Sequence, residues 1–107
     1  MAELTLGLPD DGRALATHPG AVIVIELPEN PTTGFRWSLR SQVEPVLTPK
    51  SDTFERPGKA RPGAGGSRRF AFTASARGEA SILLWNWRTW EGEGSVEKRY
   101  RVTVTVQ

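Results

Sequence analysis

Apolar and polar residues alternate with a period of two along most of this chain. The clearest run lies at the C-terminus, where the apolar positions are Tyr100, Val102, Val104 and Val106. Over no helix-sized window do apolar residues recur at the three- and four-residue spacing of an amphipathic helix. The pattern predicts an all-β protein whose last strand has one buried face and one solvated face.

Residues 22–27 are almost entirely apolar and β-branched, which is typical of a central strand that is covered on both faces. The alternation also predicts strands at residues 35–40, 68–75, 80–87 and 99–106, and shorter ones at residues 3–8, 13–17 and 51–55. Residues 55–67 are rich in glycine, proline and basic residues, so we expect a mobile loop there and no strand pairing. Seven or eight strands separated by Gly- and Pro-containing turns predict an antiparallel two-sheet β-sandwich.

The composition limits both the size and the chemistry of the protein. With 107 residues, 37% of them hydrophobic, the chain suffices for a single domain over residues 1–107 and is too short for two. It contains no cysteine, which excludes a cysteine nucleophile and cysteine-ligated metals, and its one histidine, His18, is a thin basis for a catalytic or zinc site. The carboxylates of Glu91, Glu93 and Glu97 are close in sequence, but such residues on a turn are normally just solvated. We expect neither enzyme activity nor a metal site.

The net charge of +2 is too small to indicate a polyanionic partner. A weak nucleic-acid binder remains an alternative through the basic residues Arg56, Lys59, Arg61, Arg68 and Arg69. No aromatic residue is interleaved among them, so a solvated basic loop is the simpler interpretation. The longest apolar run, residues 21–25, falls far short of the roughly 20 residues that span a bilayer. Residues 1–10 carry no export signal, which predicts a cytoplasmic protein, or an exported one if a signal has been removed.

Three connections with unusual residues are expected at the same end of the sandwich. Because consecutive antiparallel strands reverse direction, the connections at residues 28–34, 56–67 and 88–96 emerge together. The first is a rigid polar turn, the second contains a run of glycines, and the third places a cation beside a large aromatic residue. Taken alone, the first two have simple structural explanations as a turn and a linker.

Trp85 and Trp87 share one face of their predicted strand, and the opposite face is aliphatic. If the aliphatic face covers the core, both tryptophans lie on the outer face, although core packing is an equally simple role for them. Trp90 lies beyond the strand, where an aromatic residue beside an arginine is typical of an interface hot spot. An alternative function is therefore a carbohydrate- or protein-binding module that uses Trp85, Trp87 and Trp90 as a stacking platform.

Three ordered motifs of this chain resemble those of the chagasin-type inhibitors of papain-like cysteine peptidases. The first motif consists of Asn30, Pro31, Thr32, Thr33, Gly34 and Phe35. The second consists of Gly63, Ala64, Gly65 and Gly66, and the third of Arg88, Thr89 and Trp90. The similarity extends over most of the chain. The chain departs from the family pattern at Thr89, where the family usually has proline. Without proline the third loop has more conformational freedom, which corresponds to about 0.4 to 1 kcal/mol.

The resemblance implies an immunoglobulin-like β-sandwich that binds the peptidase reversibly and covers its active-site cleft with the three loops. It implies that the loop containing Thr32 enters the centre of the cleft near the catalytic cysteine and that the other two loops grip its sides. It also implies that no cofactor takes part. A monomer is expected, because the protein would bind with the tip of its sandwich.

Overall fold

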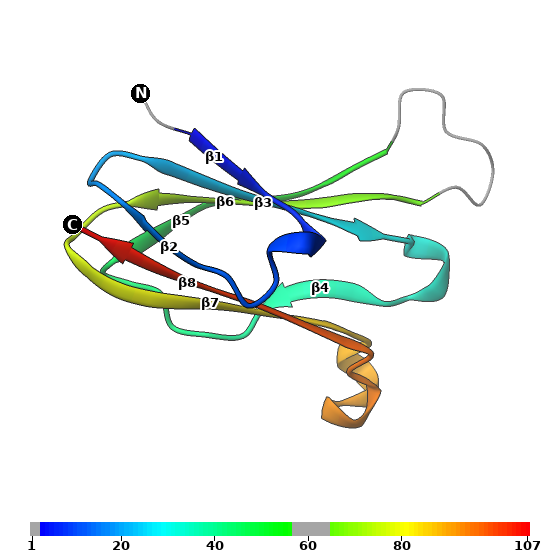
Figure 1. Ribbon diagram of the computed structural model, residues 1–107. Helices are drawn as coiled ribbons and strands as arrows, with labels where there is room; N and C mark the ends of the chain where they lie inside the picture. Colours follow the sequence, from blue (N-terminus) through cyan, green and yellow to red (C-terminus); the bar gives the residue numbers. More distant parts are fainter. Residues whose placement is uncertain (1–2, 57–64) are drawn as a thin grey trace.

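The computed structural model describes residues 3–56 and 65–107, and these form eight β-strands in two four-stranded sheets (Figure 1). The strands are β1 Glu3–Leu6, β2 Ala14–Thr17, β3 Val22–Glu29, β4 Arg36–Leu39, β5 Leu47–Glu55, β6 Gly66–Ala74, β7 Gly78–Trp87 and β8 Lys98–Val106. The 3-10 helices are η1 Leu8–Asp10, η2 Pro31–Thr33, η3 Thr89–Glu91 and η4 Glu93–Ser95. One sheet has the strand order β1-β3-β6-β5 and the other has the order β2-β8-β7-β4. The predicted all-β sandwich is confirmed.

The core lies between the two sheets and is built from alternate residues of the long strands. The apolar positions of β8 from Tyr100 to Val106 are all at most 2% exposed, as the period of two predicts. In β3, Ile23 and Ile25 face this core, while Val22 and Val24 are buried on the opposite face against Ala71. β3 is therefore a central strand covered on both faces, as its composition predicted.

Two edge strands depart from the expected antiparallel pairing. β1 runs parallel to β3, and β2 runs parallel to β8, while the other four pairs are antiparallel. Between β1 and β2 the chain passes from one sheet to the other, and the Tyr100 hydroxyl donates a hydrogen bond to the Gly7 carbonyl at 2.9 Å in this passage. Alternation predicts which residues form a strand, but it does not predict which strand becomes the neighbour.

Several strand boundaries also differ from the expectation. β5 begins at Leu47, four residues before the predicted strand, because an edge strand exposed along most of its length has no hydrophobic alternation to reveal it. Glu55 and Ser67, expected in an unpaired loop, are partners in the β5–β6 ladder. Gly66 is also in a strand and pairs with Glu29. The remaining part of that expected loop, residues 57–64, lies outside the described residues.

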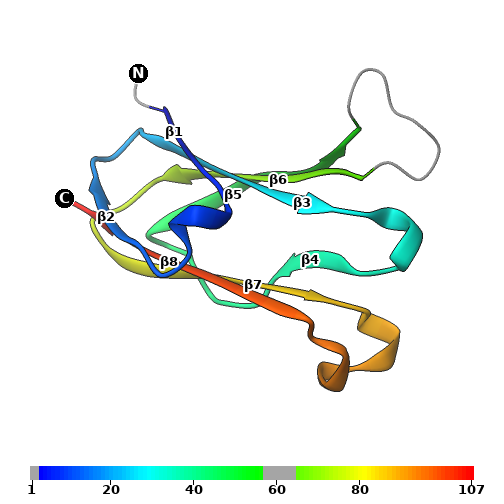
Figure 2. The same ribbon diagram turned by 45° about the vertical axis from the view of Figure 1, so that its right-hand side comes forward.

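The connection from β3 to β4 and the connection from β7 to β8 lie at the same end of the sandwich (Figure 2). β5 ends and β6 begins there as well. We call this the loop end. Within residues 3–56 and 65–107, no helix is long and apolar enough to cross a membrane. No cluster of three metal-ligating side chains occurs in the same part of the chain.

Candidate functional site

The connection between β3 and β4 carries a compact turn, residues 30–34, that we call the tip. Asn30 caps helix η2: its side-chain oxygen accepts hydrogen bonds from the Thr32 amide at 3.1 Å and from the Thr32 hydroxyl at 2.7 Å. The Thr33 hydroxyl donates to the Asn30 carbonyl at 2.9 Å. Pro31 supplies the fixed φ that suits a first helical position, and Gly34 ends the helix with a φ of +79°. The polar groups of the tip thus bond to one another and keep its backbone folded.

The third motif is attached to the tip through Arg88, which follows β7. Its guanidinium donates hydrogen bonds to the Thr33 carbonyl from Nε at 3.0 Å and from Nη2 at 2.8 Å. The same group lies over the ring of Phe35, 4.4 Å from the centroid, and its Nη1 is 3.3 Å from the Glu91 carboxylate. The first and third motifs therefore form one connected surface.

Trp90 completes this surface and remains 71% exposed. The edge of its ring lies against Gly34, where an added Cβ would be 2.9 Å from Trp90 Cη2. Glycine is thus required at position 34 for two reasons: the positive φ, and the absence of a side chain under the indole. An indole this exposed, lying beside a rigid turn, has the character of an interface anchor.

The connection from β7 to β8 is closed by Ser95. The Arg88 amide donates to the Ser95 hydroxyl oxygen at 3.1 Å, and that hydroxyl lies 2.7 Å from the Gly92 carbonyl oxygen. Thr89 is the first residue of η3, so its amide has no partner within the helix. Arg88, with φ −100° and ψ 107°, already has the extended conformation that a following proline requires. The backbone at position 89 is therefore compatible with the residue that the family usually has there.

The second motif is only partly described, because Gly63 and Ala64 lie outside the described residues. Gly65 is exposed beside the tip, and a Cβ added to it would make an ordinary contact, 3.5 Å from the Glu29 carbonyl oxygen. Gly66 is in β6, where a Cβ would collide with the Glu55 carbonyl and with the ring of Phe54. Packing between strands thus explains Gly66, whereas Gly65 presents bare backbone at the loop end.

Trp85 and Trp87 lie on the outer face of their sheet, as expected for the case in which Ile82 and Leu84 on the opposite face cover the core. Their rings meet edge to face with centroids 5.3 Å apart. The Arg40 guanidinium lies over both, 5.0 and 4.8 Å from the centroids, and Trp87 Nε1 donates to the Ser38 hydroxyl at 2.6 Å. Because an arginine covers these rings and Trp90 lies on a separate loop, the three tryptophans do not form the flat platform of the alternative hypothesis.

The basic residues at the start of β6 are not free to bind nucleic acid. Arg68 is 7% exposed and forms ion pairs with Glu29 at 2.7 Å and Asp52 at 3.1 Å. Burial acts to lower the pKa of Arg68, but the hydrogen bonds and charge of Glu29, together with the charge of Asp52, raise it above its ordinary value. Arg69 lies 3.3 Å from Glu26. Arg56 is exposed, and Lys59 and Arg61 are outside the described residues.

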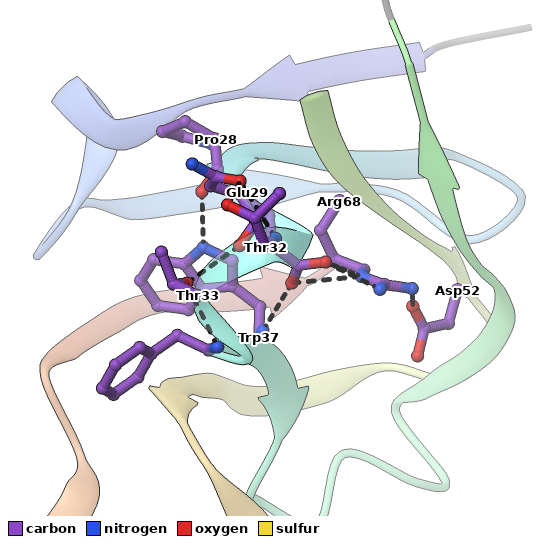
Figure 3. A network of polar contacts seen from close by, with 9 residues as sticks. Pro28, Glu29, Thr32, Thr33, Trp37, Asp52 and Arg68 are labelled. Atoms are coloured by element: carbon purple, nitrogen blue, oxygen red, sulfur yellow. Dashed lines mark hydrogen bonds and ion pairs between the residues drawn. The ribbon is translucent and has the colours of Figure 1, made fainter. Parts of the chain in front are cut away.

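Sequence reasoning missed the polar groups beneath the tip. The Glu29 carboxylate accepts a hydrogen bond from the Trp37 amide at 2.7 Å, and the Trp37 indole donates to the Pro28 carbonyl at 2.9 Å (Figure 3). Asn86, buried on the inner face of β7, lines an open hollow of about 270 Å³ together with Asn30 and other residues of the loop end. The missed signal was the alternation of β3, which continues past Leu27 and places residue 29 on the core face.

Comparison with known proteins identifies the family. The family model described as "Chagasin family peptidase inhibitor I42" matches residues 17–104. Chagasin from Trypanosoma cruzi is 33% identical over 97 residues, which cover 86% of this chain and 87% of chagasin. The fold resembles that of a cysteine protease inhibitor from Entamoeba histolytica, with a TM-score of 0.88 and 22% identity over 100% of this chain and 97% of that one. It also resembles PbICP-C, solved in complex with falcipain-2, with a TM-score of 0.59 and 18% identity over 100% of this chain and 91% of that one. The chain belongs to the chagasin family of peptidase inhibitors.

Proposed function

We propose that this protein inhibits papain-like cysteine peptidases reversibly and that its loop end fills their active-site cleft. Family membership supports inhibition of a peptidase, and the complex of PbICP-C with falcipain-2 supports a cysteine peptidase as the target. The residues that contact the enzyme are those of the three motifs, with the tip at the centre of the cleft. Gly65 lies to one side of the tip, and Arg88, Thr89 and Trp90 lie to the other.

The tip inhibits instead of being cleaved because its backbone is folded. A thiolate can attack a peptide bond only when that bond is held in reach and in line with it. In the tip, the Asn30 side chain and the Thr33 hydroxyl bond to nearby backbone groups, and Pro31 restricts its own φ. Extending this segment across the catalytic cysteine would break these bonds. The enzyme therefore receives a surface that fits the cleft without offering a bond that can be cut.

The flanking groups supply contact area at a low cost in entropy. Arg88 holds the tip in place before binding, so little order is lost when the surfaces dock. Trp90 offers a large, exposed and rigid side chain, which as a hot spot contributes about 2 kcal/mol or more. Together these features allow an interface of standard size to reach affinities on the order of nanomolar.

Inhibition by this mechanism requires neither a cofactor nor a catalytic residue of the inhibitor. The protein acts only by binding, as a single domain over residues 1–107 and as a monomer that meets one enzyme molecule. It has no enzyme activity of its own. The covalent chemistry stays with the cysteine of the target, which the tip covers.

The folded tip is the observation that carries this proposal, and a titration of papain tests it. Residual hydrolysis of a fluorogenic peptide is measured as the protein is added, and activity is measured again after dilution of the complex. We expect tight inhibition that is reversed by dilution, with the inhibitor chain intact on a gel. Absence of inhibition at micromolar protein, or cleavage of the tip, would contradict the proposal.

Substitutions at Trp90 and Thr32, each with a control, localise the contact. Trp90→Ala should raise the inhibition constant by roughly 30-fold, which corresponds to about 2 kcal/mol. Leu8→Ala is the matched control, because Leu8 is the other large hydrophobic residue exposed among the described residues and lies on η1. Thr32→Ala should weaken inhibition more than Thr32→Ser, since serine retains the hydroxyl that donates to Asn30.

A further inference from the structure

Three polar side chains are buried among the described residues, and all three lie at the loop end: Glu29, Arg68 and Asn86. Glu29 is the last residue of β3 and directly precedes the tip. Arg68 is the third residue of β6, close after Gly65. Burying an ion pair is costly, so a pair placed directly beneath the tip requires a physical reason.

The Glu29 carboxylate joins strands from both sheets. One oxygen, Oε1, accepts a hydrogen bond from the Trp37 amide of β4 at 2.7 Å. The other, Oε2, accepts from Arg68 Nη2 at 2.7 Å and from Arg68 Nε at 3.2 Å. β3 and β6 belong to one sheet, and β4 belongs to the other. A single carboxylate thus holds together β3 and β4, the two strands that the tip connects.

Arg68 extends the same network to a second connection. Its Nη1 donates to Asp52 Oδ1 of β5 at 3.1 Å (Figure 3). Its guanidinium carbon also lies 5.5 Å from the centroid of the Phe54 ring. The planar guanidinium can serve Glu29 and Asp52 at once because its donors point in fixed, different directions. The network therefore reaches all four strands that flank the tip and the second motif.

We propose that Glu29 and Arg68 are a positioning pair for inhibition, which sets the placement of the tip relative to the start of β6 without touching the peptidase. This inference rests on the proposed function. A buried pair of this kind contributes little net stability compared with apolar residues of similar volume, while its directional bonds specify one arrangement. Apolar replacements could fill the space, but they would leave the Trp37 amide without its acceptor, and among the described residues only the indole bond from Trp37 to the Pro28 carbonyl would still join the two sheets at this point.

The same two strands provide a matched control. Glu26 and Arg69 also form an ion pair between β3 and β6, at 3.3 Å, but their side chains are 45% and 34% exposed. Glu26 is itself exposed on the outer side of the strand, whereas Glu29 faces the core. The two pairs have the same residue types and the same parent strands, and they differ in burial and in contact with β4.

The experiment compares Glu29→Gln/Arg68→Met with Glu26→Gln/Arg69→Met, using the full chain. Glutamine at position 29 keeps an oxygen acceptor for the Trp37 amide, and the double replacement leaves no unpaired buried carboxylate at position 29. We expect the first variant to remain folded and to raise the inhibition constant for papain at least tenfold, and the control to stay within twofold of wild type. Equal inhibition constants for the two variants would overturn the proposal.

Arg68→Lys provides the same test without removing the charge. Lysine retains the cation but cannot bond to Glu29 and Asp52 in the fixed geometry of the guanidinium, so inhibition should weaken at least threefold, and Arg69→Lys should change nothing. Both inhibition constants are measured without urea. Urea unfolding of each variant, measured separately, shows that both are fully folded under the assay conditions. A loss of inhibition that merely followed the unfolded fraction would overturn the positioning role.

Hydrogen exchange on the free protein separates this inference from the proposed function. In Arg68→Lys, the amides of Thr33 and Gly34 should exchange several-fold faster than in wild type, while that of Val104 in the core should not change. Unchanged exchange at the tip would overturn the inference even if wild type inhibits papain. If wild type fails to inhibit, the proposed function fails, and the exchange rates still decide whether the pair orders the tip.

Discussion

The Arg88 guanidinium donates two hydrogen bonds to the backbone carbonyl of Thr33, although the two residues are 55 positions apart in the sequence. This contact converts two loops from different strand connections into one rigid surface. Gly34 adds a second contact between the two loops, because it has no side chain and the Trp90 ring can pack directly against the turn. The arrangement of the first and third motifs is therefore a property of the free protein.

Arg88→Lys should weaken inhibition by about tenfold. A lysine ammonium can replace at most part of the two-donor contact and cannot stack its plane on the Phe35 ring, and one hydrogen bond contributes about 1 to 1.5 kcal/mol. The inhibition constant for papain measures this. Arg77→Lys, in the connection at the opposite end of the sandwich, is the control and should be neutral. If the two substitutions have the same effect, the Arg88–Thr33 contact does not contribute to binding.

Gly34→Ala should lower both stability and inhibition. The positive φ alone costs about 1 to 2 kcal/mol for a residue with a side chain, and the new Cβ would also displace the Trp90 ring. Gly12→Ala separates the two effects, because Gly12 has a φ of +85° and no atom within 4 Å of an added Cβ. Urea unfolding should show a loss in both variants, whereas only Gly34→Ala should raise the inhibition constant. A normal inhibition constant for Gly34→Ala would show that the position of Trp90 is unimportant.

Thr89→Pro should stabilise the protein by about 0.4 to 1 kcal/mol and leave inhibition unchanged or tighter. Proline reduces the freedom of the unfolded chain, and the extended conformation of Arg88 already suits a following proline. Thermal unfolding and the inhibition constant give the two readouts. A large loss of inhibition would mean that Trp90 is held differently here than in relatives with proline.

Stability should fall between pH 10 and pH 12 because of Tyr100. Burial, followed by the nearby charges of Asp10 and Asp11, raises the pKa of Tyr100 to about 12 in the folded protein, above its ordinary value of 10.0. The folded state therefore keeps its proton where the unfolded state loses it, so this stabilisation is complete below pH 10 and is lost as the pH rises toward 12. The midpoint of urea unfolding at pH 8, 10 and 11.5 measures the effect.

Tyr100→Phe is the control for this pH dependence. It removes the hydroxyl that donates to Gly7, so it should be less stable than wild type at neutral pH by about 1 kcal/mol. Its unfolding midpoint should then decline less steeply above pH 10. Parallel declines in the two proteins would assign the effect to other groups.

Strand positions could be predicted wherever one face of a strand is buried and the other is wet. β8 is the clearest case, because its apolar and polar residues alternate over its whole length. β5 was only partly predicted, since Leu47 is its one fully buried residue and no alternation follows it. The parallel pairing of β1 with β3 and of β2 with β8 could not be predicted, because it depends on where the chain crosses between the sheets.

The motif residues of the candidate site were visible in the sequence, but the contacts among them were not. Arg88 and Thr33 meet because β7 pairs with β4 and Trp87 lies opposite Arg36, and no local sequence pattern records this long-range pairing. Arg68 was interpreted as one of several solvated cations, although it shares its strand face with Phe70 and Phe72, both buried. The period of two within the strand predicted over residues 68–75 places Arg68 on the same face as Phe70 and Phe72, and therefore toward the core.

The buried carboxylate of Glu29 also determines how much of this protein would have to be moved to make the tip work in another scaffold. A graft of residues 30–34 would transfer the turn and its internal hydrogen bonds but none of its supports. The smallest transferable unit contains Glu29 and Trp37 on either side of the turn, arginine and aspartate partners supplied by two adjacent strands, and Arg88 from the connection after β7. In a host sandwich whose core is entirely apolar beneath the loops, the grafted residues 30–34 would lie in a different and less ordered position.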